Sequence, residues 1–339
     1  MKALFYILVF ILIATAVWQF FKLLGLTKKE QVATEKENNI NGWLMLGLGG
    51  FIYGLMLYSM FQGRVVLLPR QSASLEGEDI DNLFVITMGL ILVVQFITQF
   101  LIYFFTFKYR GIKGRKAMFF ADSHKLEMWW TVTPTIVLSV LIIYGLYTWN
   151  NVQDVSDAEN PLIIEVYAKQ FNWEARYAGA DNELGVGHVN FIKGINTMGV
   201  DMSDKRSADD IPVRELHLPK GRKVIFKFRS QDVLHSAYMP HFRAQINCVP
   251  GMTTSFGFTP TVTTAEMREN EDTKAKFEAI NELRVTKGKD PVEFDFLLLC
   301  NKICGSSHYN MQMKVVVEEE ADFNKWLGEQ KTLAQVINN

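Results

Sequence analysis

The chain has 339 residues, 49% of them hydrophobic, and its formal net charge of −1 at pH 7 conceals an uneven distribution. Residues 1–150 carry 13 Lys and Arg against 9 Asp and Glu, whereas the remainder carries 22 against 27. An acidic second half argues against a nucleic-acid partner, because phosphate neutralisation needs clustered Lys and Arg, and three cysteines are too few and odd in number for a disulfide framework.

Four apolar stretches in the first half are long enough to cross a bilayer core, which needs about 20 helical residues. The first resembles a signal peptide, but it carries a single lysine, its apolar run is too long and no small-residue cleavage site follows it. We therefore interpret it as a retained helix, and expect residues 1–150 to form a transmembrane region. The four predicted spans are residues 3–26, 43–61, 83–107 and 128–149.

Loop charges predict the orientation of these spans. Six Lys and Arg lie within residues 108–126, after the third span, against a single acid, Asp122. The loop over residues 63–82 carries four acids against two arginines. The positive-inside rule then places residues 108–127 in the cytoplasm and residues 63–82 outside. The second half of the chain is therefore expected outside the inner membrane of a bacterium, in the periplasm.

Glu127 begins the fourth span, before Trp129, Trp130 and Pro134. A carboxylate at this place is favoured by the helix dipole, with the tryptophans as interfacial anchors. Ionisable groups at membrane helices also mark proton paths, so Glu127 is a candidate for proton uptake. The residues alone leave both interpretations open.

After residue 160 the pattern changes to short runs of alternating polarity separated by turn signals, which is typical of a β-sandwich or small barrel. We expect this domain over residues 151–320, followed by a C-terminal tail over 321–339. A loop insertion is predicted at 178–211. A second insertion is predicted at 263–290, with a Glu-, Lys- and Ala-rich helix over 263–283. The predicted strands are Ile163–Ala168, Arg214–Leu218, Lys223–Phe228, Thr254–Phe258, Phe294–Leu299 and Met313–Val317.

Metal-ligating side chains concentrate near the end of this domain. Cys300, Cys304, His308 and Met311 lie within twelve residues, and His235 is available at the predicted end of a strand. Thiolate and thioether together select a soft metal, and a single blue-copper site needs only one Cys with two His and a Met. The additional cysteine is explained if two sulfurs bridge two copper ions.

Zinc binding and ordinary core packing are the alternative interpretations of these residues. A structural zinc bound by two Cys and two His is the best alternative, but it leaves Met311 unexplained and the cysteine spacing differs from the usual two-residue knuckle. A lone His or Met on a strand is usually core, and Cys300 alone is compatible with a small buried residue. The complete ordered set favours copper.

Four patterns in the chain belong together: Glu127-x2-Trp-Thr131, Asp232-Val-Leu-His-Ser236, Val249-Pro-Gly251 and Cys300-x3-Cys304-Gly-x2-His308-x2-Met311. Together they resemble subunit II of the haem–copper cytochrome c oxidases, over roughly residues 83–320. The first two spans and both insertions lie outside the resemblance. It implies a periplasmic, all-β cupredoxin-like Greek-key barrel or sandwich that holds a binuclear copper (CuA) centre.

The resemblance also implies individual roles. Cys300 and Cys304 would bridge the two coppers, and His235 and His308 would be terminal ligands. Met311 and the backbone carbonyl of Lys302 would complete the set. Outside the centre, Glu127 matches a carboxylate at the mouth of a proton channel, and Asp232 is a candidate for docking of the electron donor.

Three departures from the family pattern matter. Lys302 stands where a Glu usually binds magnesium shared with subunit I, so we expect no magnesium at Lys302. Phe171 replaces the Trp that usually receives the electron, which leaves Phe171 and Trp173 as candidates for electron uptake. Asn247 stands where an Asp is common, and we attach no interpretation to it.

The expected function is that of the electron-accepting subunit of a respiratory cytochrome c oxidase, with no oxygen chemistry on this chain. Electrons would come from a c-type cytochrome, which is a separate protein because this chain has no Cys-x-x-Cys-His motif. They would pass to haem in subunit I, beside other oxidase subunits and membrane lipid. Three other functions fit less well. Nitrous oxide reductase needs many more histidines than this chain has, and a copper-delivery protein would have fewer metal ligands. A quinol oxidase subunit of the same fold lacks the copper ligands.

Overall fold

The computed structural model describes residues 2–27, 33–62, 71–153 and 160–337. It forms two compact units. One comprises Met1–Gly63 with Gly89–Glu127, and the other comprises Arg64–Met88 with Met128–Asn339. Residues 63–70, part of the predicted outer loop 63–82, lie outside the described residues, as do residues 154–159 just after the predicted membrane region.

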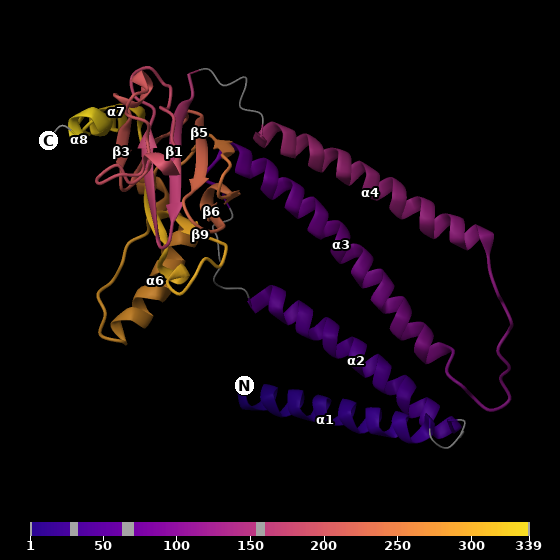
Figure 1. The fold of residues 1–339 in the computed structure, drawn as a ribbon. Coiled ribbons are helices and arrows are strands. Elements are labelled where there is room, and N and C mark those ends of the chain that lie inside the picture. Colours follow the sequence, from indigo (N-terminus) through magenta and orange to yellow (C-terminus); the bar gives the residue numbers. More distant parts are fainter. Residues whose placement is uncertain (1, 28–32, 63–70, 154–159, 338–339) are drawn as a thin grey trace. The chain divides into compact units, whose positions relative to one another are not determined.

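Long apolar helices make up most of the first half of the chain (Figure 1). In the described residues, three are long and apolar enough to cross a membrane, with mean hydropathies of 1.5, 2.3 and 1.6. The described apolar part of α1, Tyr6–Lys22, is shorter than a full span, so the first predicted span, residues 3–26, stays a prediction. The helices are α1 (Lys2–Thr27), α2 (Glu35–Gln62), α3 (Leu75–Lys108) and α4 (His124–Gln153).

Helices α2 and α3 pack closely within the first unit. The ring of Tyr53 stacks on Phe96 with centroids 5.1 Å apart, and its hydroxyl donates to the Phe96 carbonyl over 2.7 Å. A Cβ at Gly49 would lie 2.5 Å from a carbon of the Tyr103 ring. Small residues that allow such close approach are typical of helix contacts in membranes.

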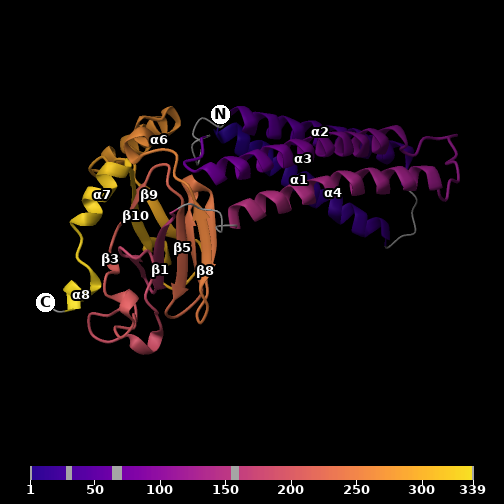
Figure 2. The same ribbon diagram turned by 90° about the horizontal axis from the view of Figure 1, so that it is seen from above.

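The second half of the chain is a β-sandwich of two five-stranded sheets, as the alternating pattern predicts (Figures 1 and 2). The first sheet has the order β3-β2-β1-β5-β8 and the second the order β4-β10-β9-β6-β7. Strands β1 and β5 pair in parallel, as do β4 and β10. The bounds are β1 Leu162–Lys169, β2 Asn172–Tyr177, β3 Ile211–Val213, β4 Leu216–Pro219, β5 Val224–Ser230, β6 His235–Met239, β7 Ala244–Cys248, β8 Thr254–Phe258, β9 Phe296–Cys300 and β10 Gln312–Glu318.

Aromatic side chains fill the space between the sheets. Phe258 of β8 stacks on Phe226 of β5 and on Phe242, with centroids 5.3 and 4.6 Å apart, and Phe242 also contacts Phe296 of β9 at 4.7 Å. All four are buried, and full burial of one such ring contributes about 1.5–3 kcal/mol. This core fixes the strands from which the ligand loops emerge.

A buried ion network holds the segment over residues 178–211 against the first sheet. The guanidinium of Arg176 donates to Glu165, to Asp210 and to the Gly185 carbonyl, and Glu165 also accepts from Arg229. Burial raises the pKa of Asp210 to about 6, because Arg176 offsets only part of the desolvation cost. The short helices here are η1 (Val189–Phe191) and η2 (Lys205–Ser207).

The segment over 263–290 and the C-terminal residues are helical. The predicted single helix over 263–283 is two helices, because Asn270 ends the first and caps the second with its side chain. In the C-terminal segment, Trp326 stacks on His217 with centroids 3.9 Å apart and Phe323 is buried. The helices are α5 (Thr264–Glu269), α6 (Glu271–Val285), α7 (Glu320–Gly328) and α8 (Leu333–Ile337).

The first turns of α3 are attached to the β-sandwich. Glu76 accepts from the Lys223 ammonium over 2.6 Å and from the Thr259 amide over 2.7 Å. Five residues further along α3, Asp81 accepts from Arg243, which directly follows the short helix η3 (Pro240–Phe242) after β6. The start of a membrane-capable helix is therefore joined by charged hydrogen bonds to three places on the sandwich, one of them the residue that follows η3.

Candidate metal centre

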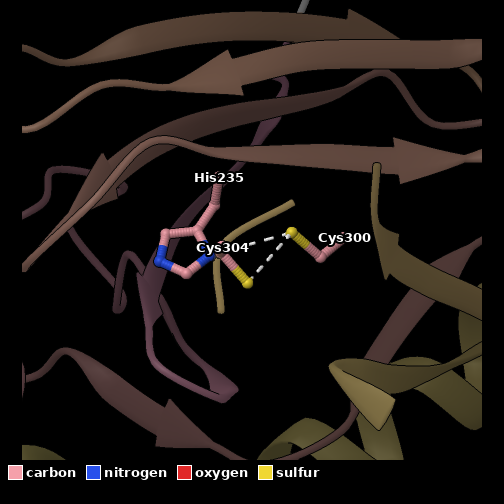
Figure 3. A group of neighbouring side chains, drawn as sticks. All are labelled: His235, Cys300 and Cys304. Carbon is pink, nitrogen blue, oxygen red and sulfur yellow. Dashed lines mark hydrogen bonds between the residues drawn. The ribbon is translucent and has the colours of Figure 1, made fainter. Parts of the chain in front are cut away.

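Three segments bring the predicted metal ligands together at one end of the sandwich. His235 is the first residue of β6, and Cys300 is the last residue of β9. These strands are antiparallel neighbours, with Ala237 opposite Cys300. Cys304 and His308 come from the loop after β9, which ends at Met311 just before β10. His235, Cys300 and Cys304 face one another (Figure 3).

The six predicted donor atoms form one cluster. The two thiol sulfurs of Cys300 and Cys304 are 3.9 Å apart. Cys300 Sγ lies 3.7 Å from Nδ1 of His235 and 3.2 Å from the Lys302 carbonyl oxygen. On the other side, Cys304 Sγ lies 3.6 Å from the Nδ1 atom of His308 and 3.8 Å from the Met311 sulfur. Each sulfur therefore has one imidazole and one weaker donor beside it.

The chemistry of these donors fits a soft metal better than a hard one. Both cysteines are free, and thioether and thiolate lie on the same side of the cluster. Burial, followed by the neighbouring Cys300, raises the pKa of the Cys304 thiol to about 11. Metal binding there must displace protons from the thiols, so affinity would rise with pH.

Asp232 orients His235 from behind. Its Oδ1 atom lies 2.9 Å from the histidine Nε2 atom and accepts from the Val233 amide. Burial opposes ionisation of Asp232, but hydrogen bonds from the Gln170 amide, His235 and Val233 outweigh it and hold its pKa below the usual range. A carboxylate on Nε2 leaves Nδ1 as the metal-binding atom, the arrangement usual behind metal-bound histidines.

The sequence did not predict two contacts between the β1–β2 turn and the ligand loop after β9. The side-chain amide of Gln170 donates to the Cys304 carbonyl. Gly305 has a φ of +142°, and a Cβ there would lie 2.8 Å from the Phe171 ring, so only glycine allows this approach. A signal was present, because Gln170 directly precedes Phe171, one of the two candidates for electron uptake.

The aromatic candidates of this turn have different positions. Trp173 is 4% exposed and its ring meets that of His235 edge-on, with centroids 6.1 Å apart. Phe171 is partly buried against the core. Two further large side chains of the ligand loop, Ile303 and Tyr309, are 86% and 87% exposed, and sequence reasoning did not single them out.

The remaining predicted residues have few contacts. The Glu127 carboxylate, in the first turn of α4, lies 3.7 Å from Nδ1 of His124. Lys302 is exposed, and within the part of the chain that the structure describes no carboxylate pairs with it. Asn247 lies opposite Ser236 in the β6–β7 pair, and its carbonyl accepts from Thr254.

Comparison with known proteins finds matches to subunit II of cytochrome c oxidases. The family model described as cytochrome c oxidase subunit II, transmembrane domain, matches residues 65–147, which include α3 and most of α4. The alternative cytochrome c oxidase subunit 2 of Bradyrhizobium diazoefficiens is 33% identical over 230 residues, which is 67% of this chain and 72% of that protein. Cytochrome c oxidase subunit 2 of Alkalihalophilus pseudofirmus is 28% identical over 249 residues, 72% of this chain and 55% of that protein.

One solved structure also aligns with part of this chain. The periplasmic domain of subunit II of the Bradyrhizobium japonicum cytochrome oxidase aligns with 52% of this chain and 95% of its own length. The two are 20% identical, with a TM-score of 0.31. The match over 72% of a 33% identical relative is the finding that decides the family.

Proposed function

This chain belongs to the cytochrome c oxidase subunit II family, and on that premise we propose that it is the electron-accepting subunit of a respiratory haem–copper oxidase. Electrons from a c-type cytochrome are taken up at a binuclear copper centre in the β-sandwich. They pass on to haem in subunit I, where oxygen is reduced to water. No oxygen chemistry takes place on this chain.

The six-donor cluster carries this proposal. Two copper ions held between the Cys300 and Cys304 thiolates would exchange single electrons at this position. The chain's contribution is rigidity: β6 and β9 hold His235 and Cys300, and Asp232 fixes the imidazole ring. Ligands that are fixed before and after electron transfer keep the reorganisation small. Met311 and the Lys302 carbonyl are the weaker donors on the two sides of the centre.

Trp173 is the residue we propose for electron uptake through the sandwich. Its ring contacts the His235 ring edge-on, so it offers a short aromatic path to a ligand. Phe171 is the second candidate, because it packs beside Gly305 in the ligand loop. Asp232 has its carboxylate committed to His235 and Gln170, and with 29% of its side chain exposed it can also face a basic donor protein.

The membrane region supplies the anchor and a route for protons. We propose four spans with residues 108–127 in the cytoplasm and the sandwich in the periplasm. Glu127 then lies at the cytoplasmic side and takes up protons for subunit I. A carboxylate in the first turn of a helix is also favoured by the helix dipole alone, and the contact with His124 is compatible with both roles. An experiment is needed to decide between proton uptake and capping.

Metal analysis of the native complex, purified with its partner chains, tests the proposed centre. It should contain two copper ions per copy of this chain, and paramagnetic resonance should detect one unpaired electron shared by both. Zinc, or one copper per chain, would contradict the proposal. Cys300→Ser should abolish the signal, whereas Cys248→Ser, at a buried free cysteine outside the donor cluster, should retain it.

A further inference from the structure

The turn between β1 and β2 touches both loops that carry the proposed copper ligands. The backbone amide of Gln170 donates to Asp232 Oδ2 over 2.7 Å. The side-chain amide of the same residue donates to the carbonyl of Cys304. One residue therefore holds the loop before β6 with its main chain and the loop after β9 with its side chain.

The first of these bonds leads directly to a ligand. Asp232 uses Oδ2 for Gln170 and Oδ1 for Nε2 of His235, at 2.9 Å. The position of the imidazole ring therefore depends on a carboxylate that is itself held by the β1–β2 turn. Since His235 is buried, the ring cannot find water as an alternative partner on that side.

The second bond reaches the other ligand loop at Cys304, directly before Gly305. Cys304 is buried, but Gly305 follows it in a backbone conformation that L side chains rarely adopt. The Phe171 ring packs against Gly305 at a distance that leaves no room for a Cβ. The turn therefore limits movement of the Cys304 carbonyl in two ways: the Phe171 ring packs against the next residue, and the Gln170 side-chain amide donates to the carbonyl oxygen.

We propose that Gln170 is a positioning residue that sets the separation of the Cys304 and His235 loops, and through it the geometry of the metal centre. This inference rests on the proposed copper-binding function. A side-chain amide suits the role because it is a neutral donor for a carbonyl oxygen. Residues behind metal ligands typically change metal affinity 10- to 100-fold when replaced.

Gln170→Met in the full chain, assembled in the native oxidase, separates this role from simple packing. Methionine has a similar length and no donor, and it leaves the main-chain bond to Asp232 in place. Gln330→Met is the matched control, because the Gln330 side-chain amide also donates to a main-chain carbonyl, that of Trp326, over 3.0 Å. Copper affinity is measured by competition with a Cu(I) chelator, and the centre by its paramagnetic resonance spectrum.

We expect Gln170→Met to weaken copper binding by about 10-fold and to change the copper hyperfine pattern, while Gln330→Met changes neither. In the copper-free chain, amides over residues 303–309 should exchange with solvent about 10-fold faster in Gln170→Met, roughly the loss of one net hydrogen bond. Unchanged affinity and spectrum would overturn the positioning role. If the unaltered chain binds no copper, the proposed function fails instead, and the exchange result still decides whether Gln170 holds the loop.

Discussion

Asp81 in α3 and Arg243 after β6 form a two-point ion pair. The guanidinium Nε and Nη2 atoms donate to the two carboxylate oxygens over 2.8 and 2.9 Å. Arg243 has a positive φ of 56°, a conformation that costs an L residue roughly 1–2 kcal/mol. Paired forks of this kind are the stronger class of protein ion pairs, so this pair attaches the first turns of α3 to the sandwich.

Removal of one partner should therefore destabilise the sandwich. Asp81→Ala is expected to lower its free energy of unfolding by about 1.5–3 kcal/mol, the usual range for hydrogen bonds to charged groups. Glu269→Ala removes a comparable pair with Lys274, whose two side chains are 76% and 49% exposed, and should cost less than about 0.5 kcal/mol. Denaturant unfolding of the purified chain, followed by tryptophan fluorescence, measures both. Equal losses would show that the α3 attachment contributes nothing special.

Acid stability should depend on His241. Burial, followed by Lys276 and Arg243, lowers its pKa from 6.5 to about 4, and its ring contacts Phe294 and Phe296. In the unfolded chain the His241 imidazole binds a proton more readily than in the folded chain. The free energy of unfolding therefore decreases as pH falls from about 6.5 to about 4, by up to about 3 kcal/mol.

His241→Phe should retain the aromatic packing and remove that part of the pH dependence. Unfolding midpoints measured at pH 7.5 and pH 4.5 give the difference. The exposed His188 supplies the control, since His188→Phe should leave the pH dependence as it was. A His241→Phe variant that loses as much stability in acid as the unaltered chain would exclude this explanation.

Glu127→Ala decides between proton uptake and helix capping. If Glu127 takes up protons, oxygen consumption by the assembled oxidase falls while the copper spectrum is unchanged. Glu35→Ala removes another first-turn carboxylate, at the start of α2, and should leave turnover unaffected. Normal turnover in Glu127→Ala, with a small loss of stability of about 0.5 kcal/mol, would support capping alone.

Met311→Leu should leave copper bound, because the thioether is the weakest side-chain donor and leucine conserves the volume of a buried site. We expect a raised reduction potential or slower electron transfer. Redox titration followed by the copper absorption band measures the first, and stopped-flow oxidation of the donor cytochrome the second. Met313→Leu, at a buried methionine two residues away, is the control. Complete loss of copper would mean that the sulfur is a principal ligand.

Lys302 should exclude magnesium from its side of the centre. An ammonium group cannot ligate a cation and repels one. We expect it to pair instead with carboxylates or haem propionates of subunit I. Lys302→Glu should create manganese binding, visible by paramagnetic resonance, whereas Lys331→Glu, the same charge change at another exposed lysine, should not. An ion with oxygen ligands at about 2.1 Å beside Lys302 in the complex would contradict the prediction.

Sequence patterns predicted the strands with the clearest alternation and missed the others. Lys223–Phe228 corresponds to β5, because its apolar positions recur every second residue. Strand β2 was missed, since it carries Arg176 in the interior. Its partner Asp210 is 34 residues away, and no local period reveals such a pair.

The donor cluster was predictable for a different reason. Four of its side chains lie within twelve residues, so any compact loop brings them close together. His235 joins them through pairing of β6 with β9, which the sequence alone does not specify. Gln170 was overlooked because its contact to Cys304 crosses 134 positions of the chain.

The short strand β6 has its proposed ligand, His235, at one end and is followed by Arg243, the partner of α3, at the other. An added or deleted residue between them would shift His235 relative to the Arg243–Asp81 ion pair and turn the strand side chains beyond it to the opposite face of the sheet. The long segments over 178–211 and 263–290 leave this stretch untouched, since they follow β2 and β8. Length variation among relatives should therefore accumulate in those two places, while the nine positions from His235 to Arg243 stay constant in number.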